Sequence, residues 1–218
     1  VKDTIILEPF AGDCDLINLL REDLTLLSDN DYINQLKLYD ITKINKIEEI
    51  KGLNIDYYEN IDTLLNSPFE NCEDNKYFVI TNPPYTAKNK LSNDLKSKYN
   101  KLLDTNVQDL YQIFIKQLIS NYPIINGGLI IIPMNFLFGK QSKSLREEFL
   151  KYFNIYRLNI FEKRMFEDTS QSTIALLFIN KQFKISSKFT KIFLHSTDIK
   201  KISLKNFEKI MEFDLTKY

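Results

Sequence analysis

The sequence has 218 residues, of which 44% are hydrophobic and 27% charged, and its formal net charge is zero. This composition indicates a soluble globular chain that is long enough for one sizeable core. No apolar run approaches the length of a membrane span, which excludes an integral membrane protein. The two cysteines, Cys14 and Cys72, have no metal-ligand spacing, so we expect a reducing, cytoplasmic compartment and no metal site.

Charge is unevenly divided along the chain. Residues 1–80 hold 7 basic and 17 acidic residues, a net charge of −10, and residues 81–218 hold 22 basic and 12 acidic residues, a net charge of +10. Zero net charge argues against an indiscriminate nucleic-acid binder, but a basic half of the chain suits contact with a polyanion. Solvated surface lysines are the alternative explanation.

The first predicted strand, Thr4 to Leu7, runs into the turn Glu8-Pro9-Phe10-Ala11-Gly12, and apolar residues then recur at helical spacing. Strand, glycine turn and helix form the opening of a doubly wound nucleotide-binding sheet, where glycine lets the backbone approach a ligand. The loop is acidic and has no lysine, so it repels pyrophosphate and tolerates a cationic ligand such as S-adenosylmethionine. An ordinary βα turn is the alternative.

Two further predicted strands lead to acidic residues. The strand Leu36 to Asp40 ends in an aspartate that is placed to accept both hydroxyls of a ribose, and Ile41 follows it. The strand 54–58 is followed by the loop Asp62-Thr63-Leu64, whose aspartate could accept a hydrogen bond from a cofactor adenine amino group. A surface residue at a strand end and a helix N-cap are the alternatives for the two aspartates.

The fourth predicted strand, Tyr77 to Ile80, is followed by Thr81-Asn82-Pro83-Pro84-Tyr85. Two consecutive prolines cannot continue a ladder, because each lacks an N–H group and has a fixed φ. Pro83 also disfavours a helical backbone at Asn82. The sequence therefore predicts a stiff loop at the carboxyl end of a strand, which is where open α/β sheets bind ligands.

This proline loop offers chemistry for a planar amino group. The Asn82 side-chain carbonyl and the Pro83 main-chain carbonyl are two acceptors for an amino group that carries two hydrogens. Tyr85 adds an aromatic face beside them. Two hydrogen bonds that favour a pyramidal nitrogen would free a lone pair that is otherwise delocalised into the ring. A proline-rich turn after a core strand is the alternative.

The second half of the chain continues the alternation of helices and strands. Residues 86–106 form a long loop with five lysines, and long loops beside a site are often functional. The remaining predicted elements are a helix from Val107 to Leu118, a turn at Gly127-Gly128, strands over 129–132, 155–161, 172–179 and 191–194, and helices over 145–153 and 203–213.

The order of these motifs resembles the adenine-specific, amino-methylating DNA methyltransferases of restriction–modification type. The resemblance rests on 8–12, Asp40, 62–66 and Asn82-Pro83-Pro84-Tyr85, and also on Asp109-Leu110-Tyr111 with Phe114. It implies a Rossmann-like S-adenosylmethionine-dependent methyltransferase fold, with a mostly parallel seven-stranded sheet, one antiparallel edge hairpin and helices on both faces. It also implies that the loops 8–12, 40–41 and 62–64 with Asn82 bind the cofactor.

The same resemblance implies that the proline loop holds a flipped adenine of double-stranded DNA. Such enzymes stack a second aromatic residue on the base from the loop between their last strands, and Phe166 is the candidate for that position. The family often has a second glycine where Cys14 stands.

The sequence divides into a catalytic domain over residues 1–180 and a short basic extension over 181–218 that we expect to pack on the same domain. Residues 181–209 carry eight lysines and two acidic residues, a composition suited to phosphate contacts that position without specifying sequence. The extension is too short for a full target-recognition domain, so we expect a further domain or a partner subunit to supply sequence specificity.

The motifs favour an enzyme that transfers the methyl group of S-adenosylmethionine to the exocyclic amino group of adenine in DNA. The proline loop suits any planar amino group, so a methyltransferase acting on RNA or on a protein glutamine is the nearest alternative. A non-catalytic DNA-binding or scaffolding subunit is an alternative of another class, favoured by Cys14 and by the missing recognition domain.

Overall fold

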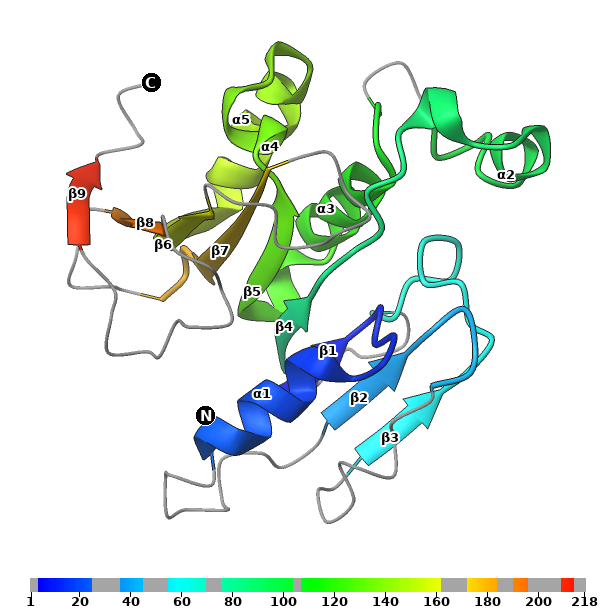
Figure 1. Ribbon diagram of the computed structural model, residues 1–218, viewed down its shortest axis with the longest axis horizontal. Coiled ribbons are helices and arrows are strands. Elements are labelled where there is room, and N and C mark those ends of the chain that lie inside the picture. Colours follow the sequence, from blue (N-terminus) through cyan, green and yellow to red (C-terminus); the bar gives the residue numbers. More distant parts are fainter. Residues whose placement is uncertain are drawn as a thin grey trace.

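The computed structural model describes residues 4–24, 36–44, 55–69, 76–103, 107–161, 172–183, 190–195 and 209–213. The strands of these segments join in one sheet, and helices lie against both of its faces (Figure 1). None of the helices in the described segments is long and apolar enough to cross a membrane.

The sheet contains nine described strands in the order β3-β2-β1-β4-β5-β7-β6-β8-β9. The strand bounds are β1 Thr4–Glu8, β2 Leu36–Tyr39, β3 Ile55–Tyr58, β4 Lys76–Thr81, β5 Ile125–Pro133, β6 Phe153–Phe161, β7 Thr173–Asn180, β8 Thr190–His195 and β9 Lys209–Phe213. Strands β1 to β5 pair in parallel, and β7 runs antiparallel between β5 and β6.

Strands β1 to β7 confirm the predicted Rossmann-like methyltransferase sheet, with the β6–β7 hairpin as its antiparallel part. Two more strands extend this sheet, because β8 pairs in parallel with β6 and β9 pairs antiparallel with β8. The predicted helix over 203–213 is therefore wrong for residues 209–213. Their backbone finds hydrogen-bond partners along the open edge of β8, and tertiary pairing of this kind overrides local helix propensity.

The glycine pair Gly127-Gly128 lies inside β5 and does not form a turn before it, so the strand begins at Ile125. A Cβ atom at Gly127 would come closer than 3.0 Å to the carbonyl oxygen of Phe178. One at Gly128 would approach the Val79 carbonyl oxygen as closely. The glycines are thus required by the close approach of the backbones of β7 and β4, which a turn interpretation misses.

The described helices are α1 Asp15–Leu24, α2 Asn93–Lys98, α3 Leu110–Ser120, α4 Asn135–Phe138 and α5 Lys143–Tyr152. Side chains of a strand alternate between its two faces, and β1 shows which helices lie on which face. Ile5 and Leu7 belong to the cluster that contains α3 and α5, whereas Ile6 packs against the smaller cluster that contains Ile17 of α1. Helix α1 and helices α3 and α5 thus lie on opposite faces.

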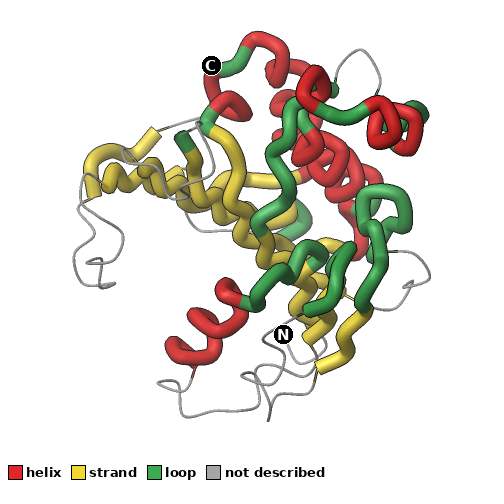
Figure 2. The backbone as a smooth tube through the Cα atoms, turned by 45° about the vertical axis from the view of Figure 1, so that its right-hand side comes forward, coloured by secondary structure: helices red, strands yellow, loops and turns green. Residues whose placement is uncertain are grey.

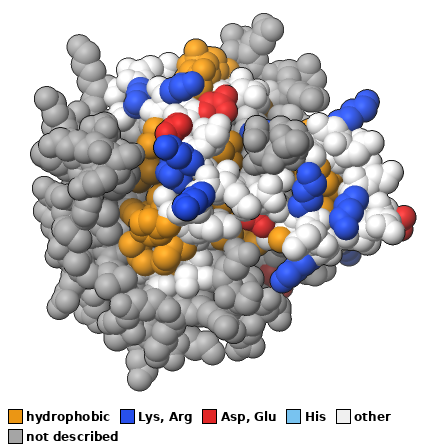
Figure 3. Space-filling model, turned by 90° about the horizontal axis from the view of Figure 1, so that it is seen from above, with side chains coloured by type: hydrophobic (Ala, Val, Ile, Leu, Met, Phe, Trp, Pro, Cys, Tyr) orange, Lys and Arg blue, Asp and Glu red, His pale blue; other side chains and the backbone are white. Residues whose placement is uncertain are grey.

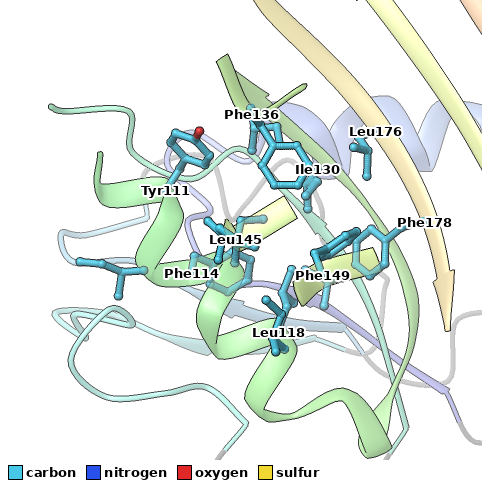
Figure 4. Packing of buried hydrophobic residues seen from close by; sticks show 14 of the residues in the cluster. Tyr111, Phe114, Leu118, Ile130, Phe136, Leu145, Phe149, Leu176 and Phe178 are labelled. Carbon is cyan, nitrogen blue, oxygen red and sulfur yellow. The ribbon is translucent and has the colours of Figure 1, made fainter. Parts of the chain in front are cut away.

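The larger core lies between the sheet and helices α3, α4 and α5. Figure 4 shows Phe114 and Leu118 of α3 facing Phe149 of α5, with Phe178 of β7 beside them. Phe149 and Phe178 pack edge to face, with ring centroids 5.2 Å apart. Aromatic pairs in this geometry stabilise the packing of α5 against β7.

The loops that follow β1, β2, β3, β4 and β5 emerge at one edge of the sheet, because these strands are parallel (Figure 2). The motifs singled out in the sequence lie on these loops. This is the carboxyl edge, where doubly wound sheets bind their ligands.

Candidate functional site

The proline loop Asn82-Pro83-Pro84-Tyr85 leaves the carboxyl end of β4, as the sequence predicts. Tyr85 is half-buried, and its hydroxyl donates to the main-chain carbonyl of Ile131 in β5 at 2.9 Å. The same hydroxyl lies in hydrogen-bond contact with Oδ1 of Asn82. The tyrosine therefore fixes both the loop and its asparagine to the neighbouring strand.

The tyrosine hydroxyl has a single proton, so it can donate to only one of these two oxygens at a time. The Ile131 carbonyl can only accept, whereas the amide of Asn82 can turn its NH₂ group toward the tyrosine oxygen. A turned amide then presents Oδ1 of Asn82 to the site. Burial raises the pKa of the Tyr85 phenol, so the hydroxyl keeps its proton at neutral pH.

The chain just after Tyr85 has a second anchor. The backbone N–H of Leu110 donates to the Thr86 carbonyl at 3.1 Å, and Ala87 forms an isolated bridge with Asp109. Asp109 caps helix α3 in a reciprocal arrangement with Gln112. The predicted Asp109-Leu110-Tyr111 motif thus holds the exit of the proline loop against the start of α3.

Glu8 ends β1 and is fully buried beside the proline loop. Its Oε1 accepts from the Thr81 hydroxyl at 2.5 Å and from the Phe10 backbone N–H at 3.1 Å. Its other oxygen, Oε2, is buried with no hydrogen-bond partner among the residues that the structure describes. Burial is the main reason that the pKa of Glu8 is raised well above its ordinary value, and the nearby charge of Asp40 adds to it. A buried carboxyl oxygen of this kind calls for a donor or a cation.

Asp40 follows β2 and binds the glycine turn of the first loop. Its Oδ2 accepts from the Gly12 backbone N–H at 2.8 Å, and its Oδ1 accepts from the backbone N–H and the hydroxyl of Thr42 at 2.8 and 2.7 Å. Oδ2 keeps one lone pair for a ligand, because a carboxylate oxygen can accept twice. Ile41 is 52% exposed beside it, so an apolar side chain is available to cover a flat ring.

Two residues of the first loop have left-handed backbone conformations. Gly12 has φ +52°, and no atom lies within 4 Å of where its Cβ would be, so open space borders the glycine. Cys14 has φ +61° and is buried. This conformation favours glycine, which is the residue that the resemblance places there. Burial and the surrounding carboxylates raise the pKa of the Cys14 thiol to about 11, so it stays neutral and unreactive.

The loop after β3 is tied to the first loop and to α3. The Thr63 hydroxyl donates to the Pro9 carbonyl at 2.9 Å, and Gln117 of α3 donates to the carbonyls of Thr63 and Leu64. The side chains of Pro9, Thr63 and Leu64 are buried, and the Thr63 hydroxyl is engaged with the Pro9 carbonyl.

Asp62 has a buried carboxylate in the described part of that loop, and this carboxylate is already engaged. Oδ1 accepts from the Leu64 backbone N–H at 3.2 Å, and Oδ2 accepts from the Tyr99 hydroxyl at 2.8 Å. The Lys98 ammonium lies 2.7 Å from Oδ2. Tyr99 and Lys98 come from the segment after the proline loop.

Basic side chains lie around this edge of the sheet. Figure 3 views the molecule from above Figure 1 and shows lysine and arginine side chains among hydrophobic and acidic ones on that face. Lys90, Lys98 and Lys101 are exposed on the segment that follows the proline loop. The carboxylates of Glu8, Asp40 and Asp62, by contrast, are buried at the loop bases.

The sequence pattern that defines the Eco57I restriction-modification methylases matches residues 15–166, which is more than half of the chain. The chain belongs to the Eco57I restriction-modification methylase family. No curated protein sequence matches the chain at a significant level.

Solved structures share the fold of this Eco57I-family chain at low sequence identity. A Listeria monocytogenes protein assigned to the class I S-adenosylmethionine-dependent methyltransferases has a TM-score of 0.64 and 15% identity over 90% of this chain and 60% of its own. A Vibrio vulnificus protein assigned as the modification subunit of a type I restriction enzyme has a TM-score of 0.62 and 13% identity over 91% of this chain and 44% of its own.

A third relative was solved with nucleic acid. The ATP-dependent type ISP restriction-modification enzyme LlaBIII, bound to DNA, has a TM-score of 0.56 and 15% identity over 89% of this chain and 18% of its own. At these identities the likeness shows the fold alone. The Eco57I-family chain spans 60% and 44% of the lengths of the first two proteins, so the activities of the whole proteins do not transfer to it directly.

In this Eco57I-family chain, the predicted site residues of the loops 8–12, 40–41, 62–64 and 82–85 gather at one edge of the sheet. Phe166, the predicted second stacking residue, lies outside the described residues. Sequence reasoning missed Thr81, Tyr99 and Ile131, which hold Glu8, Asp62 and Tyr85. Of these three residues, only Thr81 could have been recognised from the sequence, because it is a polar residue at the end of an apolar strand.

Proposed function

We propose that the chain is a methyltransferase that transfers the methyl group of S-adenosylmethionine to the exocyclic amino group of a flipped-out adenine in DNA. The observation that carries the proposal is the proline loop with its asparagine clamped by Tyr85 to β5, at the same edge of the sheet as the buried carboxylates of Glu8, Asp40 and Asp62. Membership in a restriction-modification methylase family supports methyl transfer as the reaction class.

The residues at the carboxyl edge fit the charge and shape of this cofactor. The unpartnered Oε2 of Glu8 is an acceptor for a cationic group at the end of the ligand. Asp40 keeps an acceptor position for a ribose hydroxyl, and Ile41 offers an apolar surface for the adenine ring. Asp62 provides the acceptor for the adenine amino group. Cys14 already has the backbone conformation of the second glycine, so its presence does not prevent the turn from forming.

S-adenosylmethionine supplies a methyl group made electrophilic by its bond to a sulfonium sulfur. Asn82 Oδ1 and the Pro83 carbonyl accept the two amino hydrogens of the target base and hold its nitrogen where the lone pair can form the new N–C bond. The carbon–sulfur bond breaks as that bond forms, and the sulfur keeps the bonding electrons. The nitrogen then loses one proton to solvent, so none of the loop residues needs to act as a strong base.

DNA as the substrate is consistent with the basic segment beside the loop and with a related enzyme solved on DNA. Extruding an adenine from the duplex costs a few kcal/mol, and stacking on Tyr85 can return about 1–3 kcal/mol of that. A phosphate-contacting lysine surface positions a duplex but reads few bases. We therefore propose that a further domain or a partner subunit supplies sequence specificity.

The buried, free thiol of Cys14 fits a reducing cytoplasm.

The test is a methyl-transfer assay with isotopically labelled S-adenosylmethionine and the 218-residue chain. Duplex DNA, structured RNA and a glutamine-containing peptide are offered in parallel, and labelled nucleosides from the DNA arm are identified. N6-methyladenine in the DNA arm, lost in Asn82→Ala, supports the proposal. Label in RNA or peptide alone identifies one of the alternative substrates, and cofactor binding without transfer to any acceptor indicates a scaffolding subunit.

A further inference from the structure

Asp62 is joined to a segment that is distant in sequence and that no cofactor motif includes. The Tyr99 hydroxyl donates to Oδ2 of Asp62 at 2.8 Å across 37 residues, and Lys98 forms an ion pair with the same oxygen at 2.7 Å. The Lys98 ammonium also lies 5.6 Å from the centroid of the Tyr99 ring. Three side chains therefore form one cluster at the base of the loop after β3.

Tyr99 is held in place from several directions. Its side chain is only 4% exposed and belongs to the main core cluster. Its backbone N–H donates to Leu95, and its carbonyl accepts from Leu103, both at 2.9 Å. Burial is the main reason that the pKa of the Tyr99 phenol is raised, so the hydroxyl remains a donor at neutral pH. A fixed donor of this kind sets the orientation of the carboxylate that it contacts.

The two carboxylate oxygens of Asp62 differ in how many further hydrogen bonds they can accept. A carboxylate offers about four acceptor positions, two on each oxygen. Oδ2 is filled by Tyr99 and Lys98, whereas among the residues that the structure describes Oδ1 receives only the long 3.2 Å contact from the Leu64 backbone. One acceptor position on Oδ1 is therefore left for a ligand. Without its partners at Oδ2, the carboxylate could rotate and lose that direction.

We propose that Tyr99, assisted by Lys98, is a positioning residue that aims Oδ1 of Asp62 at the exocyclic amino group of the cofactor adenine. This inference rests on the proposed function, because it assumes that an adenine-bearing cofactor occupies the loop. A carboxylate can accept from an amino group but repels a carbonyl oxygen at the same place. Tyr99 thus determines how strongly the chain selects an adenine cofactor over the hypoxanthine equivalent.

Isothermal titration calorimetry tests this selection without relying on turnover. The two ligands are S-adenosylhomocysteine and S-inosylhomocysteine. The first has an amino group at C6 of the purine and an unprotonated N1, and the second has a keto group at C6 and a hydrogen on N1. We expect the wild-type chain to bind the adenine ligand more tightly, by roughly tenfold or more, because a buried acceptor is left without a donor in the keto complex. Tyr99→Phe should weaken binding of the adenine ligand several-fold and leave binding of the hypoxanthine ligand unchanged or tighter.

Lys98→Met is a second variant for the same cluster, and it does not threaten the fold because the Lys98 side chain is 40% exposed. Like Tyr99→Phe, it should reduce the ratio by which the chain prefers the adenine ligand over the hypoxanthine ligand. Tyr122→Phe is the matched control, because Tyr122 is 38% exposed and lies before β5, at the opposite edge of the sheet. Circular dichroism of each variant checks that it is folded.

The outcomes separate this inference from the proposed function. A preference for adenine that narrows in Tyr99→Phe or Lys98→Met supports the inference. Three results for Tyr99→Phe overturn the inference alone. They are an equal loss of affinity for both ligands, an unchanged affinity for both, and a tighter binding of the adenine ligand. A wild-type chain that binds neither S-adenosylmethionine nor its product overturns the proposed function, and the inference with it.

Discussion

The Thr81 hydroxyl donates a 2.5 Å hydrogen bond to Oε1 of Glu8, and the two residues are the last of neighbouring parallel strands. Thr81 directly precedes the proline loop, and Glu8 begins the acidic first loop. The bond therefore ties the proposed target-base loop to the proposed cofactor loop. Both ends are fully buried, so the register between the two loops is set within the core of the sheet and not at its surface.

The burial of Glu8 makes folding stability depend on pH. The folded-state pKa of Glu8 lies above its unfolded-state value, so the folded chain binds this proton more tightly. The stabilising contribution is fully present below the unfolded-state pKa and is lost as pH rises through the folded-state pKa. Glu8→Gln removes the ionisation and keeps an oxygen for Thr81. Urea unfolding should show that Glu8→Gln raises the free energy of unfolding more at pH 8 than at pH 5.

Glu148→Gln is the control for this pH dependence, because Glu148 is exposed on α5. It should change the free energy of unfolding by the same small amount at both pH values. An equal effect of Glu8→Gln at pH 5 and pH 8 would contradict the prediction, because it would mean that the folded chain binds the Glu8 proton no more tightly than the unfolded chain does.

The role of Asn82 is tested by separating methyl transfer from cofactor binding. Asn82→Ala removes an acceptor for the target amino group but no contact that holds the first three loops together. We expect the single-turnover rate to fall by about a hundredfold or more, and the Kd for S-adenosylmethionine to rise much less, because Asn82 is only one of the residues assigned to the cofactor. Asn154→Ala is the matched control, since Asn154 is exposed near the start of β6. More than half of the wild-type rate in Asn82→Ala would rule out the assigned role.

Tyr85 combines two roles that two substitutions can separate. Tyr85→Phe keeps the aromatic face but removes the hydroxyl that contacts Asn82 and Ile131. The rate should fall by about tenfold because the asparagine loses its clamp. Tyr85→Ala also removes the face, so it should weaken the fluorescence signal of a flipped 2-aminopurine placed at the target position. The assignment of stacking to Tyr85 would be wrong if Tyr85→Phe and Tyr85→Ala gave the same fluorescence.

The seven core strands and the placement of the motif loops at strand ends could be predicted from local signals, whereas the seven-stranded sheet was expected from the family resemblance. Apolar β-prone runs such as Tyr77–Ile80 end at residues that stop a strand, and the paired prolines do so by covalent geometry. Gly127-Gly128 misled the prediction, since glycine marks both turns and close backbone approach. Only the neighbouring strands β4 and β7 decide between these meanings.

The contacts that hold the site residues could not be predicted, because they join residues far apart in sequence. Glu8 and Thr81 are 73 residues apart, and Asp62 and Tyr99 are 37 apart. Each of these polar side chains also has a common local use, as a cap or a surface group. Spacing along the chain carries no information that would pair them, whereas the parallel register of β1 with β4 does.

The backbone of Cys14 gives a stability prediction whose sign differs from the usual one. Glycine normally destabilises a folded chain relative to alanine, because it has more conformational freedom to lose. At φ +61° an L side chain is disfavoured by about 1–2 kcal/mol, so the order should reverse here. We expect Cys14→Gly to unfold in urea with a free energy about 1 kcal/mol higher than Cys14→Ala. Both variants lose the same buried sulfur and differ only in the Cβ atom of alanine. Ala11→Gly is the control in the same loop, since the structure gives Ala11 no positive φ, and there glycine should destabilise. If Cys14→Ala proved the more stable of the two Cys14 variants, the left-handed conformation at this position would be wrong.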